Sequence, residues 1–156
     1  MGLLQNIQRE PVTSLTLREA ITAPPTLPVP EAVTTMKKKQ LGCVIVVDQQ
    51  NKPLGTFTER SVVTLLHEDP NAFGSAVVGD HLDPKWSRVR EKDPVLSVIK
   101  GMQIEDVRFV VVVDEQDCVV ALTGQKGIME YVAEHYPQQV LVQRVGSKPP
   151  AYREGA

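Results

Sequence analysis

The chain contains an internal repeat, and this repeat constrains the fold more than any single motif does. The segment 28–50 recurs without a gap at 94–116, which is 66 positions later. The residues identical in both copies are Pro28/Pro94, Val29/Val95, Met36/Met102, Val44/Val110, Val46/Val112, Val47/Val113, Asp48/Asp114 and Gln50/Gln116. Beyond the shared aspartate we place a one-residue deletion, which aligns Thr58 with Thr123. We therefore expect two similar units packed on each other, with any ligand site present in two related copies.

Both copies predict the same order of secondary structure, β-α-β-β-α. Apolar residues at helical spacing predict a first helix after each proline, and they are Val29, Ala32, Val33 and Met36 in one copy and Val95, Val98, Ile99 and Met102 in the other. The apolar runs Cys43–Val47 and Phe109–Val113 predict strands buried on both faces, each followed by a hairpin. Thr58 and Thr123 are expected to cap the second helices. The predicted fold class is α/β in the α+β sense, with small sheets packed with helices and pseudo-two-fold symmetry between the repeats.

The domain boundaries follow from the repeat and from turn-forming residues. Pro70, Asn71 and Gly74 indicate a loop between the two copies. We assign residues 1–11 to an N-terminal extension, 12–69 to the first repeat, 70–77 to a linker, 78–139 to the second repeat and 140–156 to a partly flexible C-terminal tail.

The composition argues against several classes of function. A net charge of -2 gives no reason to expect nucleic acid as a partner, and no apolar run is long enough to span a membrane. The first residues lack the pattern of a secretory signal, and the two cysteines lie in different repeats, so we expect reduced thiols and a cytoplasmic protein. The three histidines share no ligand spacing and no catalytic constellation is present, so we expect neither a metal site nor an enzyme.

The order of elements, together with one sequence motif, resembles a known family. Residues 53–61, with the sequence PLGTFTERS, are similar to the Gly-hydrophobic-hydrophobic-Thr-x-Arg-Asp run of CBS domains, and residues 120–126 match it more loosely. Over most of its length the chain looks like a tandem pair of CBS (cystathionine-β-synthase) domains, a Bateman module. The resemblance implies a regulatory, non-catalytic module and a homodimer in which helices of two chains stack. It also implies inter-repeat clefts that take AMP, ADP, ATP or S-adenosylmethionine as regulatory ligands, with no required cofactor.

The resemblance also implies which residues would bind the ligand. In such modules the strand backbone holds the base, the threonine and helix N-terminus meet phosphate or ribose, and an aspartate three residues after the threonine accepts the ribose hydroxyls. Carried onto this sequence, the first cleft comprises Ile21, Thr22, Gly42, Cys43, Val44, Thr58, Arg60 and Ser61. The second cleft comprises Arg88, Val89, Arg108, Phe109, Val110, Thr123 and Lys126.

The chain departs from the family pattern at the ribose position. Ser61 and Lys126 stand where aspartate is usual, and neither side chain accepts two hydrogen bonds as a carboxylate does. Two hypotheses follow. The chain is either a nucleotide-sensing module that regulates an unidentified protein partner, or a dimerisation or scaffold module that binds no ligand. If a nucleotide binds, we expect Thr58→Ala to weaken binding more than Thr123→Ala, because the motif around Thr58 is the better preserved.

Two further expectations concern packing. Trp86 either packs at the start of the second repeat or stacks on a base at the mouth of a cleft. The second helix of the first repeat carries surplus apolar side chains, which favours burial of that helix in a homodimer; these residues are Val62, Val63, Leu65 and Leu66.

Overall fold

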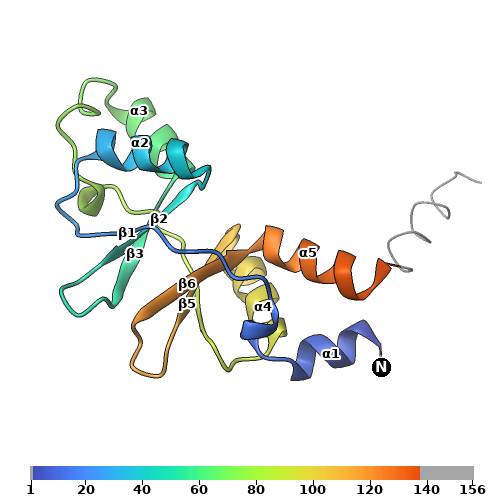
Figure 1. Ribbon diagram of the computed structural model, residues 1–156. Helices are drawn as coiled ribbons and strands as arrows, with labels where there is room; N and C mark the ends of the chain where they lie inside the picture. The colour runs from blue at the N-terminus through green and yellow to red at the C-terminus, as the bar shows by residue number, and fades with distance from the viewer. Residues whose placement is uncertain (1, 138–156) are drawn as a thin grey trace, which may run out of the picture.

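The computed structural model describes residues 2–137, which form two β-α-β-β-α units (Figure 1). The first unit consists of β1 (Thr22–Ala23), α2 (Val29–Lys39), β2 (Cys43–Val47), β3 (Pro53–Thr58) and α3 (Glu59–Glu68). The second consists of β4 (Arg88–Arg90), α4 (Val95–Glu105), β5 (Phe109–Val113), β6 (Val119–Gly124) and α5 (Gln125–His135). The predicted fold class and order of elements are confirmed. The predicted tail, 140–156, lies outside the described residues.

Each unit contains a three-stranded sheet with the central strand buried on both faces. The strand orders are β1-β2-β3 and β4-β5-β6, and in each sheet the first pair is parallel and the second antiparallel. On β5, Val110 and Val112 face the core of the second unit, whereas Val111 and Val113 join the core of the first. This alternation follows from the two-residue period of a strand, and it makes β5 part of the contact between the units.

The first helix of each unit begins and ends in the same way. Pro28 and Pro94 are the N-caps of α2 and α4, where a missing N–H costs no helical hydrogen bond. Gln40 and Asp106 end the two helices in the left-handed conformation, with φ of 50° and 53°. Because these two residues are 66 positions apart, the duplication extends to the geometry of the helix ends.

The hairpins correct one prediction about the repeat. Cys43 pairs with Thr58 in the first sheet, and Phe109 pairs with Gly124 in the second, so the spacing of 66 continues through both hairpins. The one-residue deletion predicted from the sequence is therefore wrong. Gly124 is the structural counterpart of Thr58, and Thr123 is the counterpart of Phe57.

Two short 3-10 turns are exchanged between the units. The turn Val12–Ser14 precedes the first unit in sequence, yet Val12 is buried in the core of the second. The turn Val78–Asp80 precedes the second unit, yet Val78 is buried in the core of the first. The Val12 N–H donates to the Asp93 carbonyl at 2.8 Å, and the Val78 N–H donates to the Leu27 carbonyl at 2.9 Å. The packing of the two units therefore crosses the boundaries assigned at residues 12 and 78.

The N-terminal helix α1 (Leu3–Arg9) lies against the second unit, beside α4 and α5 (Figure 1). Leu3 and Ile7 pack on the second core, and the Asn6 amide donates to the Tyr136 hydroxyl. The Tyr131 hydroxyl donates to the Glu10 carboxylate at 2.6 Å. Within residues 2–137, no helix has the length and apolar character needed to cross a membrane.

Candidate functional site

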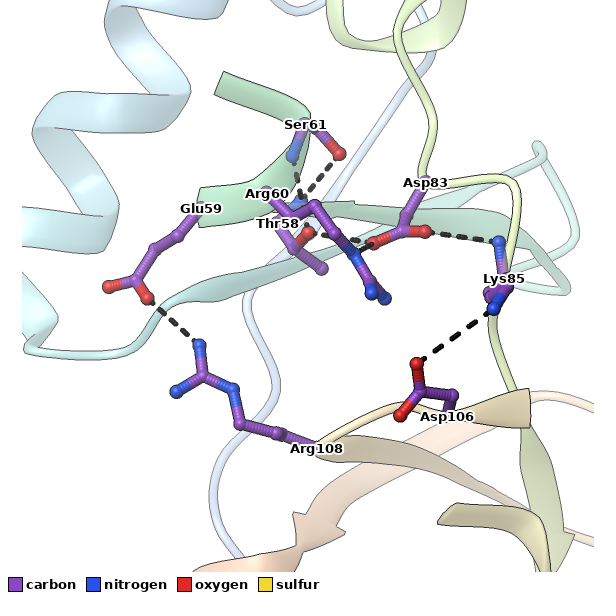
Figure 2. Close-up of polar contacts among 8 residues, drawn as sticks. All are labelled: Thr58, Glu59, Arg60, Ser61, Asp83, Lys85, Asp106 and Arg108. Carbon is purple, nitrogen blue, oxygen red and sulfur yellow. Dashed lines mark hydrogen bonds and ion pairs between the residues drawn. The ribbon is translucent and has the colours of Figure 1, made fainter. Parts of the chain in front are cut away.

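A cleft between the two units is the candidate functional site, and we call it the inter-unit cleft. Its cavity volume is about 120 Å³. Residues from both units and from the connecting segment line it, and they are Thr56, Thr58, Arg60, Asp83, Lys85, Trp86, Asp106, Val107, Arg108 and Phe109. Figure 2 shows Thr58 and Arg60 on one side of this cleft and Asp106 and Arg108 on the other. A ligand bound here would contact both units at once.

The N-terminus of α3 forms one wall of the cleft. Thr58 caps this helix as predicted, and its hydroxyl accepts a hydrogen bond from the Ser61 N–H at 3.4 Å. In return, the Thr58 N–H donates to the Ser61 hydroxyl at 3.0 Å, which completes a capping box. Ser61 is only 5% exposed. Its hydroxyl oxygen therefore serves the capping box of α3.

A buried carboxylate, Asp83, lies directly against this helix N-terminus (Figure 2). Its Oδ2 atom accepts hydrogen bonds from the Thr58 hydroxyl at 3.0 Å and from Arg60 Nε at 2.9 Å. Its Oδ1 atom accepts a hydrogen bond from the Lys85 N–H at 3.0 Å. A role for Asp83 was not predicted from the sequence. One signal could have revealed it, which is that an acidic residue in one copy corresponds to the apolar Leu17 in the other, 66 positions earlier.

Ion pairs join the two walls of the cleft. Arg108 Nη2 lies 3.3 Å from Glu59 Oε2, and Lys85 Nζ lies 3.9 Å from Asp106 Oδ2 (Figure 2). All four side chains are more than half exposed. Exposed pairs of this kind are worth about 0.2–1 kcal/mol each. A ligand can therefore open them at little cost.

Two aromatic rings also line the cleft. Trp86, the only tryptophan of the chain, and Phe109 are both half-buried and pack against the core of the first unit. The Arg108 guanidinium lies 5.9 Å from the centre of the Phe109 ring, within the range of a cation–π contact. Flat aromatic and guanidinium surfaces of this kind suit a planar heterocycle.

The residues expected in two separate clefts are distributed differently. Thr58 and Arg60 from the first set meet Arg108 and Phe109 from the second in the inter-unit cleft. Several others are buried in the cores, namely Ile21, Cys43, Val44, Val89 and Val110. Outside the inter-unit cleft, Thr22 lines a groove beside β1, Gly42 lines a groove beside α2 and α3, and Arg88 is exposed on β4.

Both cysteines are free thiols in this structure, and Cys118 is half-buried. Burial, with a smaller contribution from the nearby Asp83 carboxylate, raises the pKa of the Cys43 thiol to about 12. A thiol with this pKa is neutral and unreactive at neutral pH.

The second copy lacks the polar groups of the first. Gly124, and not Thr123, is the N-cap of α5, and no side chain caps that helix. Thr123 instead points into the core, where its hydroxyl is buried without a hydrogen-bond partner among residues 2–137. Lys126 is exposed and lies 3.8 Å from Glu130. The groove on this side is lined by Thr16, Leu17, Arg18, Glu19, Lys39, Leu41 and Glu130. In the part of the chain that the structure describes, no group of three His, Cys, Asp or Glu side chains is placed to hold a metal ion.

Comparisons with known proteins identify the first repeat. Residues 12–68 match the CBS domain family. An uncharacterized protein of Methanopyrus kandleri, MK0525, is 23% identical over 113 residues, which cover 72% of this chain. The same alignment spans 58% of the length of that relative.

Solved structures match the whole fold. The CBS domain pair of protein MJ0100, solved in complex with 5′-methylthioadenosine and S-adenosyl-L-methionine, superposes with a TM-score of 0.70 at 20% identity, covering 80% of this chain and 97% of that one. The CBS domain protein PAE2072 from Pyrobaculum aerophilum, complexed with AMP, has a TM-score of 0.68 at 16% identity, covering 88% of this chain and all of the other. The resemblance to a tandem CBS pair is therefore confirmed.

Proposed function

Since the chain folds as a tandem CBS domain pair, we propose that it is a non-catalytic regulatory module that binds an adenine-containing ligand in the inter-unit cleft. The ligand classes are the adenine nucleotides AMP, ADP and ATP, and S-adenosylmethionine. Solved CBS pairs of the same fold are complexed with AMP in one case and with S-adenosyl-L-methionine in another, which supports this class of ligand. The ligand state would be passed to a protein partner.

The observation that carries this proposal is the make-up of the inter-unit cleft. Trp86 and Phe109 offer ring surfaces for a base, and the half-exposed Arg60 at the N-terminus of α3 offers guanidinium donors. The cavity of about 120 Å³ is smaller than the ~300–1,000 Å³ typical of ligand pockets. Ligand entry therefore requires the walls to separate and the two exposed ion pairs to open. Ligand binding would therefore change the relative position of the two units, and this change of conformation is what a protein partner could detect.

Trp86 makes the proposal directly testable. We expect one of these adenine compounds to change Trp86 fluorescence and also to raise the melting temperature, because a ligand at 100 times its Kd adds about 2.7 kcal/mol to folding stability. Thr58→Ala should weaken binding more than its matched control Thr123→Ala, since only Thr58 lies in the cleft. A thermal shift without any fluorescence change would place the ligand elsewhere. If millimolar ligand produces neither a thermal shift nor a fluorescence change, the proposal is contradicted.

A second function, assembly, is favoured by apolar side chains on the outer faces of α3 and α5. Val63 is 67% exposed and Met129 is 65% exposed, and the two residues occupy the same position in the two copies. Leu65, by contrast, is buried in the first core. We propose that these outer faces form a closed homodimer, whether or not a ligand binds.

The dimer proposal predicts that Val63→Asp combined with Met129→Asp weakens self-association at least tenfold, because both charges would be buried in the interface. Sedimentation at micromolar concentration measures the effect. Ile104→Asp is the control, since Ile104 is 76% exposed but lies on α4. A wild-type chain that sediments as a monomer would contradict the proposal. A dimer that responds to none of the adenine compounds would support the scaffold hypothesis instead.

A further inference from the structure

The Asp83 carboxylate lies beside the N-terminus of α3 and contacts the side chains of Thr58 and Arg60 there. The amide groups and the dipole of α3 favour negative charge at this end of the helix. The Asp83 side chain is 1% exposed, and its two oxygens accept hydrogen bonds from Thr58, Arg60 and Lys85. The hydroxyl proton of Thr58 is committed to this carboxylate. The chain thus supplies its own anion at the position that a ligand phosphate would need.

The remaining charges of the cleft are also balanced. Each cation that lines the inter-unit cleft has a carboxylate partner, the pairs being Arg60–Asp83, Lys85–Asp106 and Arg108–Glu59. These six side chains sum to zero net charge. Only the first of the three pairs has a buried member, so the other two can open for a ligand while Asp83 stays in place.

The carboxylate and its hydroxyl donor are present in one copy and absent together from the other. The structural counterparts of Asp83 and Thr58 are Leu17 and Gly124. The basic residue is kept in both copies, as Arg60 and Lys126. In the second copy Lys126 pairs with Glu130 instead, so a buried carboxylate at this place belongs only to the cleft that carries Thr58.

We infer that Asp83 is a specificity-determining residue that makes the inter-unit cleft select an uncharged adenine nucleoside over its phosphorylated form. This inference rests on the proposed binding of an adenine-containing ligand, and it favours an adenine nucleoside over the nucleotides proposed above. A phosphate approaching the N-terminus of α3 meets a fixed like charge, and such juxtaposition disfavours the charged ligand. An uncharged nucleoside meets no such repulsion. The fixed carboxylate therefore penalises AMP and not adenosine.

The test compares adenosine with AMP, two ligands that differ only in the phosphate. Affinities are measured by titration, with Trp86 fluorescence as the readout, for the wild-type chain, Asp83→Asn and Asp80→Asn. Asp80 is an exposed carboxylate three residues earlier, so its variant controls for the loss of one negative charge. We expect the wild-type chain to bind adenosine at least tenfold more tightly than AMP. Asp83→Asn should shift this ratio toward AMP at least tenfold, and Asp80→Asn should change it less than threefold.

The outcomes separate the inference from the function on which it rests. Tighter binding of AMP than of adenosine by the wild-type chain overturns the inference and leaves the proposed function standing. An unchanged ratio of adenosine affinity to AMP affinity in Asp83→Asn also overturns the inference. A general loss of stability would lower both affinities and leave this ratio unchanged. If Asp83→Asn does not fold, the wild-type ratio alone decides. Binding of neither compound overturns the inference, and the proposed function is then decided by the same titration with ADP, ATP and S-adenosylmethionine.

Discussion

Gly124→Ala will destabilise the protein by about 3 kcal/mol or more, because no space exists for a β-carbon at this position. A β-carbon on Gly124 would lie 2.0 Å from the Arg108 carbonyl oxygen and 3.1 Å from the Phe109 α-carbon. Both neighbours are backbone atoms at the start of β5, where Phe109 pairs with Gly124, so neither can move aside without disturbing the sheet. The Gly124 φ of 157° adds strain for any residue with a side chain.

Urea denaturation measures this effect, and Gly74→Ala is the matched control. Nothing lies within 4 Å of a β-carbon built on Gly74, so that variant should change stability by less than about 0.5 kcal/mol. A loss below about 1 kcal/mol for Gly124→Ala would mean that the end of β6 moves away from β5 freely. That result would contradict the close approach of Gly124 to the Arg108 carbonyl oxygen.

Gly124 also explains why the alignment of the two copies was misplaced. The pairing of Thr58 with Thr123 rested on identity between two residues, and it required a deletion in a hairpin. The structure keeps both hairpins at one length, with left-handed Asn51 and Asp117 at matching positions in the turns. A gapless alignment pairs Arg60 with Lys126 and Glu59 with Gln125, so chemical similarity over several positions was the better guide.

The strands and helices were predictable from the sequence because their signals are local. The runs Cys43–Val47 and Phe109–Val113 became the buried strands β2 and β5, and the apolar stripes became α2 and α4. The candidate site was harder to predict because it is made by contacts between units. Asp83 meets Thr58 across 25 positions, and Arg108 meets Glu59 across 49, and neither pairing leaves a spacing pattern in the sequence.

The exchanged 3-10 turns are another contact that sequence spacing cannot reveal. The repeat places Val12 and Val78 at equivalent positions, but it does not say which core each one enters. Because the turn before the first unit packs on the second core and the turn between the units packs on the first core, the two units hold each other together. Because the two units are held together, the walls of the inter-unit cleft have a defined separation in the absence of ligand. A ligand can then change that separation by a defined amount.

The exchange predicts which unit loses structure when a turn is disrupted. Val12→Asp should cost about 4 kcal/mol or more, because Val12 is fully buried and the new carboxylate would have no partner charge. Thr13→Asp is the control, since Thr13 is exposed in the same turn and its substitution should change stability by less than about 0.5 kcal/mol. Hydrogen exchange locates the damage. Val12→Asp should expose the amides of β5 and β6 first, and the reciprocal Val78→Asp those of β2 and β3. If Val12→Asp instead loosened β2 and β3, the turn would belong to the unit that follows it in sequence.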